Sequence, residues 1–180
     1  AIEIANMGEY FMTSVIVTGL GIIILLVVSI PCAYALSRFE FKGRGILNSF
    51  FHAGIFVNVN YIVVPIFLML LDWDIMLRKN TGSGFFLDNR FVLALVYSAT
   101  AIPFTIYLLS NYFRTIPKDF EEAASVDGAS HFRTMMSIMV PMAKPSIITV
   151  VLFNFLAFWN EYIIALTLMP NSTKTLPVGL

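Results

Sequence analysis

The stretch YFMTSVIVTGLGIIILLVVSIPCAYALS, residues 10–37, contains no aspartate, glutamate, lysine, arginine or histidine. An α-helix crosses the hydrocarbon core of a bilayer with about 20 residues, so this run is long enough to span it. The run is too long for the apolar core of a signal peptide, and no basic residue precedes it. The stretch therefore predicts a transmembrane helix.

Three further runs have the same character, at residues 46–71, 91–113 and 146–169, and together they contain one histidine and one glutamate. Charged residues make up 12% of the 180 residues and hydrophobic residues 58%, whereas a soluble domain carries about 25% charged residues. Four such runs in a soluble core would leave little surface for water. We predict an all-α fold, a polytopic transmembrane helix bundle that forms a single domain over 1–180, with spans at about 10–37, 46–71, 91–113 and 146–169.

The rest of the composition excludes several functions. The net charge is zero, which gives no indication of nucleic-acid binding, and the only cysteine, Cys32, implies no disulfide. His52 and His131 are isolated, and the sequence has no metal-ligand set or nucleophile–base pair. We therefore expect neither an enzyme nor a metal site.

The connections between the runs predict the orientation in the membrane. Residues 38–45 and 114–145 carry seven of the eleven basic residues, and the remaining four lie in 72–90 and in the tail. Cytoplasmic loops carry an excess of lysine and arginine. We expect 38–45 and 114–145 to be cytoplasmic, and 72–90 to be an external loop with a flexible turn at Asn80–Gly84.

The polar insert at 114–145 contains EEAASVDGASHFRTMMSIMVPMAKP at 121–145. Acidic residues after Pro117 favour the positive end of a helix dipole, Asp127-Gly128 indicates a turn, and Ser130 begins a second helix. That second helix carries apolar residues on one face: Phe132, Met135, Met136, Met139 and Val140. The residues alone leave two uses open, a helix pair lying on lipid headgroups or a docking element whose apolar face contacts a cytosolic protein.

The spacing of the insert resembles the signature loop of the membrane subunits of binding-protein-dependent ABC importers. In that loop Glu-Ala-Ala is followed at fixed spacing by Gly, Ile, an aliphatic residue and Pro. The chain matches these positions at Glu122, Ala123, Ala124, Gly128, Ile138, Val140 and Pro141, with valine in place of the usual leucine. Asp127-Gly128-Ala129 resembles the version found in carbohydrate permeases. AYALSRFEFKGR (33–44), FLAFWNEYIIALTL (155–168) and TLPVGL (175–180) extend the resemblance to sugar permeases of the maltose type.

The resemblance implies a helix-turn-helix coupling loop that docks on a cytosolic ATPase dimer, with Glu122 at the contact and Gly128 at the corner. It also implies a second permease subunit, a paralogue or a copy, and an extracytoplasmic solute-binding protein. The chain has no G-x-x-x-x-G-K-[ST] phosphate cradle, so ATP would be bound and hydrolysed by the partner. Such permeases usually have six spans, so the four visible here are expected to be part of a larger set in the cell (inner) membrane.

The polar residues within the predicted spans are candidates for the substrate path. Glu161 is the one carboxylate in the last predicted span, and an intramembrane carboxylate is costly. Trp159 and Asn160 beside it would give a sugar a stacking ring and hydrogen bonds. Asn58, Asn60 and Asn154 are further candidates, although hydrogen bonding between helices would explain these residues equally well.

The function that these expectations favour is import of a sugar or oligosaccharide by alternating access. The alternatives are an ABC permease for another small solute, and a secondary transporter or channel with an interfacial helix. A secondary transporter would need intramembrane charges for ion coupling, and the sequence offers one glutamate.

Overall fold

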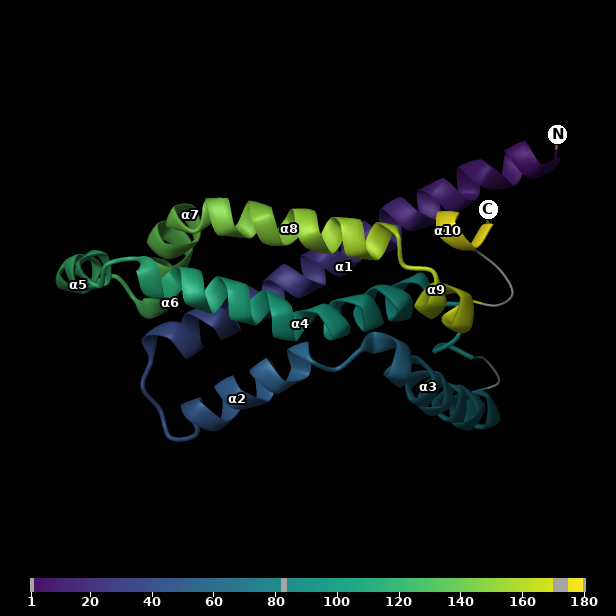
Figure 1. Cartoon of the computed structure of the whole chain (residues 1–180), viewed down its shortest axis with the longest axis horizontal. Coiled ribbons are helices and arrows are strands. Elements are labelled where there is room, and N and C mark those ends of the chain that lie inside the picture. The colour runs from purple at the N-terminus through teal and green to yellow at the C-terminus, as the bar shows by residue number, and fades with distance from the viewer. Residues whose placement is uncertain (1, 82–83, 170–174, 180) are drawn as a thin grey trace. The chain divides into compact units, whose positions relative to one another are not determined.

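The computed structural model describes residues 2–81, 84–169 and 175–179, and none of these residues lies in a β-strand (Figure 1). The first four helices are α1 (Ile2–Arg38), α2 (Arg44–Ile55), α3 (Val59–Thr81) and α4 (Arg90–Thr115). They are followed by α5 (Asp119–Val126), α6 (His131–Thr134), the π-helix η1 (Met135–Met139), α7 (Val140–Met142), α8 (Lys144–Trp159), α9 (Ile163–Leu168) and α10 (Leu176–Gly179). The predicted all-α fold is confirmed.

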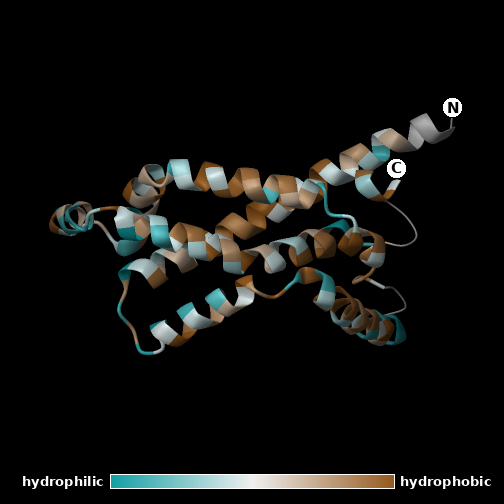
Figure 2. Cartoon of the chain, viewed as in Figure 1, coloured by the Kyte–Doolittle hydropathy of each residue, from teal (hydrophilic) through white to brown (hydrophobic). Residues whose placement is uncertain are grey.

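Three helices are long and apolar enough to cross a membrane, over Met7–Arg38, Val59–Lys79 and Arg90–Thr115. A fourth candidate is the broken pair His131–Met142 and Lys144–Trp159, whose two parts meet at 75°. Figure 2 shows apolar residues along most of α4 and α8 and hydrophilic residues on the connection between α1 and α2. The predicted membrane-helix bundle is therefore confirmed, and α1 and α4 contain the segments predicted at 10–37 and 91–113.

The single helix predicted over 46–71 is corrected to two helices, because α2 ends at Ile55 and α3 begins at Val59. The side chain of Asn58 accepts a hydrogen bond from the backbone N–H of Asn60 at 3.0 Å. A short polar side chain that bonds nearby backbone competes with helix propagation. At its other end α3 continues to Thr81, so much of the predicted loop 72–90 is helical, and residues 82–83 of its predicted turn lie outside the described residues.

The last predicted span, 146–169, is also corrected to two helices. Asn160 donates both its side-chain amide, at 2.7 Å, and its backbone N–H, at 3.2 Å, to the carbonyl of Leu156 in the last turn of α8. The Glu161 carboxylate accepts the backbone N–H groups of Ile163 and Ile164 at 3.1 and 3.2 Å, which caps the start of α9. Glu161 therefore lies at a helix break, and not within a continuous span.

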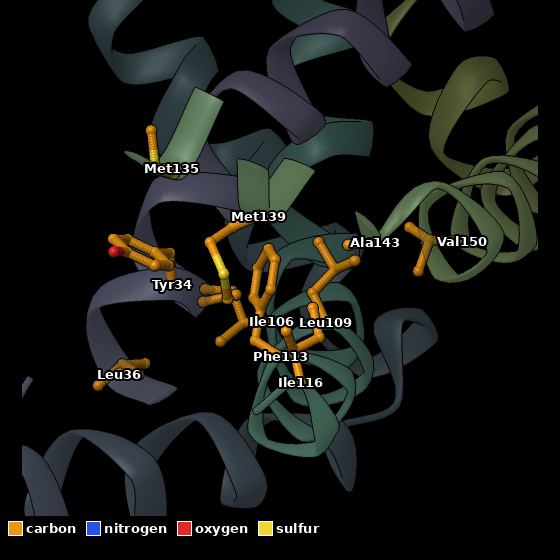
Figure 3. Packing of buried hydrophobic residues seen from close by; sticks show 11 residues of the cluster. Tyr34, Leu36, Ile106, Leu109, Phe113, Ile116, Met135, Met139, Ala143 and Val150 are labelled. Carbon is orange, nitrogen blue, oxygen red and sulfur yellow. The ribbon is translucent and has the colours of Figure 1, made fainter. Parts of the chain in front are cut away.

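The helices form two compact units. The first comprises Ala1–Ile24, Val57–Thr100 and Phe155–Leu180, and the second comprises Leu25–Phe56 and Ala101–Asn154. The core of the second unit is an apolar cluster from the C-terminal parts of α1 and α4, from η1 and from the region of α8 (Figure 3). Its members are Ala33, Tyr34, Leu36, Ile106, Leu109, Phe113, Ile116, Met135, Met139, Ala143 and Val150. The polar insert is anchored to this cluster through Met135 and Met139.

In the first unit, a hydrogen bond from Ser98 and the buried carboxylate of Asp74 hold separate segments of the chain together. Ser98 donates to the carbonyl of Gly21 at 2.8 Å, where α4 meets α1. Asp74 on α3 is 1% exposed and accepts the backbone N–H groups of Phe85 and Phe86, both at 2.8 Å. The Arg78 guanidinium lies 2.7 Å from the same carboxylate. Asp74 thereby attaches residues 85 and 86, in the segment that leads to α4, to helix α3.

Candidate functional site

The polar insert folds as the predicted pair of short helices, and in Figure 1 α5 projects beyond the other helices of its unit. Gly128 follows α5 with a φ of +77°, in the left-handed region that favours glycine. The N–H of Gly128 bonds to Ser125 and the N–H of Ala129 bonds to Ala124, at 3.0 and 2.9 Å. This pair of bonds is a Schellman motif, so Gly128 ends α5 and turns the chain toward α6.

The second helix begins directly after its N-cap residue Ser130, whose hydroxyl accepts the N–H of Arg133 at 3.4 Å. The apolar face predicted for this helix is divided in the structure. Met135 and Met139 are 4% and 0% exposed and belong to the core cluster, whereas Phe132 and Met136 are exposed. The expectation that the whole face is free for a partner is therefore corrected, because half of it anchors the insert to its own unit.

The residues that match the signature loop differ in exposure. Glu122, Ala123, Asp127, Gly128 and Pro141 are exposed, Ile138 is half-buried, and Ala124 is buried. An ideal Cβ built on Gly128 would meet no atom within 4 Å, so space within this chain does not require a glycine there. Four of the exposed members, Glu122, Ala123, Asp127 and Gly128, lie on α5 and in the turn after it, and Pro141 lies on α7.

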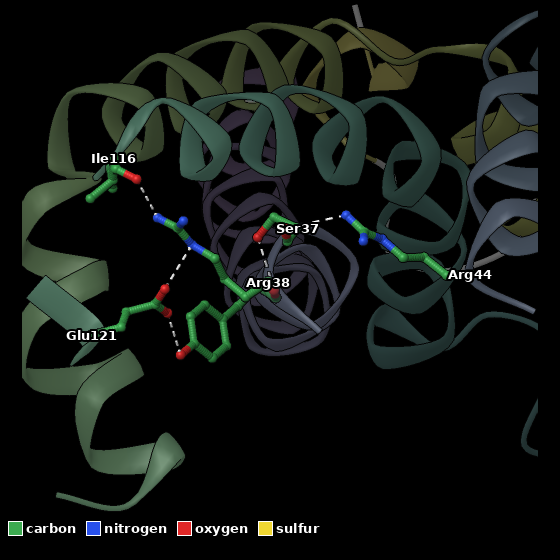
Figure 4. Close-up of polar contacts among 6 residues, drawn as sticks. Ser37, Arg38, Arg44, Ile116 and Glu121 are labelled. Carbon is green, nitrogen blue, oxygen red and sulfur yellow. Dashed lines mark hydrogen bonds and ion pairs between the residues drawn. The ribbon is translucent and has the colours of Figure 1, made fainter. Parts of the chain in front are cut away.

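Sequence reasoning missed the residues that hold α5 in place (Figure 4). Arg38, the last residue of α1, forms an ion pair with Glu121 at 3.2 Å and donates to the carbonyl of Ile116 at 2.7 Å. Tyr34 donates its hydroxyl to the other oxygen of Glu121 at 2.7 Å, across 87 residues of sequence. Arg38 entered the sequence analysis only as a basic loop residue, because no local spacing relates it to Glu121.

The predicted substrate-path residues do not all have free polar groups. Asn154 is 4% exposed, and it donates to the hydroxyl of Thr105 at 3.2 Å and to the carbonyl of Val150 at 2.8 Å. Hydrogen bonding between helices thus accounts for Asn154 within its own unit. Asn58 and Asn60 are exposed, at the break before α3 and in its first turn.

The group Trp159, Asn160 and Glu161 lies at the end of α8, in the first unit. The Trp159 ring stacks on Phe155 with ring centroids 5.5 Å apart and meets the edge of Phe11 at 5.7 Å. Both phenylalanines are exposed, at 41% and 50%. Trp159 is therefore part of an aromatic cluster that is open to its surroundings, and the exposed Asn160 follows it directly. Across the described part of the chain, no three His, Cys, Asp or Glu side chains form a candidate metal site.

These features define a class of protein: a helical membrane protein whose polar helix pair is anchored to a buried apolar cluster. A family model described as "Binding-protein-dependent transport system inner membrane component" matches residues 26–179. The chain belongs to this family.

Curated relatives and a solved structure agree with the family match. The chain is 38% identical over 170 residues to the diacetylchitobiose uptake system permease protein NgcG of Streptomyces coelicolor, covering 94% of the chain and 53% of that protein. It is 30% identical over 174 residues to a trehalose/maltose transport system permease protein of Thermococcus litoralis, covering 95% and 58%.

The structure is similar to a crystal structure of a bacterial ABC transporter involved in the import of the acidic polysaccharide alginate. The TM-score is 0.80 at 28% sequence identity, over 96% of the chain and 56% of that chain. The chain thus spans slightly more than half the length of these relatives.

Proposed function

We propose that the chain is part of the permease subunit of an ATP-driven importer that moves a sugar or oligosaccharide across the cell membrane by alternating access. A separate ATPase dimer would bind and hydrolyse the ATP, so the chain itself would carry no cofactor. The observation that carries the proposal is the edge of α5 and its turn, where Glu122, Ala123, Asp127 and Gly128 are exposed on an anchored helix. Nucleotide-driven closure of the ATPase would reach the spans through this edge.

The charge and the exposed apolar residue of this edge favour a protein partner over a lipid surface. Interfacial helices are typically rich in lysine and arginine on their polar face, whereas the exposed charged residues in the first turn of α5 are the carboxylates Asp119 and Glu122. Anionic headgroups of the inner leaflet would repel these carboxylates. Val126, which is 89% exposed at the end of α5, gives the same edge an apolar contact for a protein cleft.

The proposed substrate class rests on the relatives. The names of the two quoted relatives specify diacetylchitobiose and trehalose or maltose, and the similar structure imports alginate. All of these are saccharides, which we favour over another small solute. We propose in addition a solute-binding protein at the outer face and a second permease subunit, either a paralogue or a copy.

The proposed orientation places 38–45 and 114–145 in the cytoplasm and the connection between α3 and α4 outside, because basic residues are concentrated in the first two segments. In a Cys32→Ser background, a single cysteine at Ser130 should resist an impermeant reagent in intact cells, and one at Phe85, which is 50% exposed, should react. The reverse labelling pattern would invert the orientation.

Variants at Gly128 test the coupling function. Gly128→Trp adds a bulky ring that a partner cleft would not accommodate, at a position where a Cβ meets no atom of this chain within 4 Å but where the positive φ strains most side chains. The matched control is Gly128→Asn, because asparagine tolerates positive φ and is small. In the reconstituted transporter, Gly128→Trp should release the ATPase or uncouple hydrolysis from transport, and Gly128→Asn should retain both. Glu122→Lys should weaken ATPase retention through charge reversal. Wild-type ATPase retention and transport in both Gly128→Trp and Glu122→Lys would contradict the coupling function and favour the alternative, a helix pair that lies on lipid headgroups.

Two variants test the substrate path at the end of α8. Trp159→Ala removes the ring that stacks on Phe155. Glu161→Gln retains a carbonyl oxygen that can cap α9 and removes only the charge. We propose that Trp159→Ala lowers the apparent affinity for the sugar and that Glu161→Gln alters it less. If both variants transport with wild-type affinity and selectivity in a normally assembled complex, the path does not pass these residues.

A further inference from the structure

We propose that Arg38 and Tyr34 are positioning residues that set the orientation of α5 through Glu121, so that the neighbouring Glu122 faces the ATPase. The two consecutive carboxylates of the insert would then have separate roles, with Glu121 holding the helix and Glu122 contacting the partner. This inference rests on the proposed coupling function, because it takes the ATPase as the protein that contacts α5.

The structure separates the two carboxylates. Consecutive residues on a helix point about 100° apart, so they do not share a face. The Glu121 side chain is 18% exposed and both of its oxygens have partners, Arg38 and Tyr34. Glu122 is exposed. The signature spacing identifies only the second glutamate, and it gives no role to the first.

The partners of Glu121 are themselves fixed. Tyr34 is 4% exposed, and its ring meets the edges of Phe39 and Phe113 with centroids 5.6 and 6.0 Å apart. The Arg38 side chain is 6% exposed, and its second bond goes to the carbonyl of Ile116, directly after α4. The link therefore ties α5 to the ends of both α1 and α4, so a shift of either helix acts on α5 through one carboxylate.

Little else holds α5 on this side. A cavity of about 400 Å³ lies beside the link, lined by Tyr34, Arg38, Glu121, Glu122, Ser130 and His131 among others. Ala124 is the one buried residue of α5, and an eight-residue helix is too short to be stable by itself. Because packing leaves room for α5 to turn, the polar link decides its orientation.

The test measures the orientation of α5 separately from ATPase binding. Spin labels at Val126 on α5 and at Ile148 on α8, which are 89% and 60% exposed, report an intramolecular distance within one unit. The labels are placed in a cysteine-free background of the full permease and measured without the ATPase, because Val126 lies at the proposed contact edge, and ATPase retention and transport are measured on the unlabelled variants. Glu121→Gln and Tyr34→Phe remove parts of the link, Arg38→Lys keeps its charge, and Glu122→Gln is the matched control on the exposed neighbour.

We expect one narrow distance in the wild type, in Arg38→Lys and in Glu122→Gln without the ATPase, and a broad or second distance in Glu121→Gln and Tyr34→Phe. Glu121→Gln removes the charge that pairs with Arg38 and that strengthens the bond from Tyr34. A hydrogen bond to a charged group changes a population by about tenfold or more, so transport per ATP hydrolysed should fall by about tenfold in Glu121→Gln. Glu122→Gln should instead weaken ATPase retention. Tyr34→Phe loses only a hydroxyl, so it keeps the test valid if Glu121→Gln does not assemble.

The outcomes distinguish this inference from the coupling function. An unchanged narrow distance in Glu121→Gln and Tyr34→Phe, or equal broadening in Glu122→Gln, overturns the positioning role even if the Glu122 variant loses the ATPase. Broadening in Glu121→Gln with wild-type ATPase retention and transport in both glutamate variants overturns the coupling function, and the positioning role with it.

Discussion

Each unit contains an arginine–carboxylate pair, and burial is distributed differently in the two pairs. In Arg38–Glu121 both side chains are largely buried, at 6% and 18% exposed. In Arg78–Asp74 the carboxylate is buried at 2% exposed and the arginine is 62% exposed. Asp74 is held mainly by two backbone N–H groups, whereas Glu121 depends on side chains from another helix. The Arg38–Glu121 pair joins segments that are distant in the sequence. The Arg78–Asp74 pair lies in a local connection, where the backbone N–H groups hold Asp74 and Arg78 adds little.

The largest effect should come from Arg38→Met. The substitution leaves Glu121 without its cation in a largely buried site, which costs about 3 kcal/mol. We expect faster amide hydrogen exchange across α5 than in the wild type, measured by mass spectrometry on the nucleotide-free transporter. Arg38→Lys is the control that keeps the charge. Unchanged exchange in α5 would show that the pair does not hold the helix.

A smaller effect is expected from Asp74→Asn. Asparagine keeps one oxygen for the N–H groups of Phe85 and Phe86, but its amide group opposes the Arg78 guanidinium. The loss of a hydrogen bond to a charged group costs about 1.5 kcal/mol. Exchange should accelerate at residues 84–89 and remain unchanged in α5. Asp72→Asn, at an exposed carboxylate two residues earlier, serves as the control and should have no effect.

Arg78→Met should have the smallest effect. Its partner keeps two backbone hydrogen bonds, and an ion pair with one largely exposed side chain contributes about 0.5 kcal/mol, which salt screens further. The midpoint of thermal unfolding should shift little and the shift should vanish at high salt. If Arg78→Met destabilised the protein as much as Arg38→Met, the burial of the two ion pairs would not predict the free-energy cost of removing the arginine.

The apolar runs and the insert spacing were sufficient to predict the membrane-helix fold and the location of the helix pair. They were not sufficient to place the ends of the helices. The runs 46–71 and 146–169 are apolar over most of their length, and Asn58 and Glu161 interrupt the helices there by accepting nearby backbone N–H groups. A hydropathy pattern measures the preference for lipid, and it does not record which backbone groups a polar side chain will satisfy.

In the insert, too, the features that depend on neighbouring residues were predictable and the features that depend on tertiary contacts were not. Ser130 as a helix start and Asp127-Gly128 as a turn follow from local backbone chemistry, and the structure confirms both. The regular apolar face from Phe132 to Val140 did not indicate which of its residues would be buried. The π-helix at Met135–Met139 and the packing of Met139 against its own unit depend on neighbours far away in sequence.

The sequence by itself determined the class of fold, the polar insert and the residues of the signature spacing, because these depend on composition and on periods of a few residues. Only the tertiary structure decided which of two adjacent glutamates is held and which is presented. That choice depends on Arg38 and Tyr34, which reach Glu121 across more than eighty residues of sequence. No local pattern encodes such a contact, since it forms only when packing brings the ends of α1, α4 and α5 together.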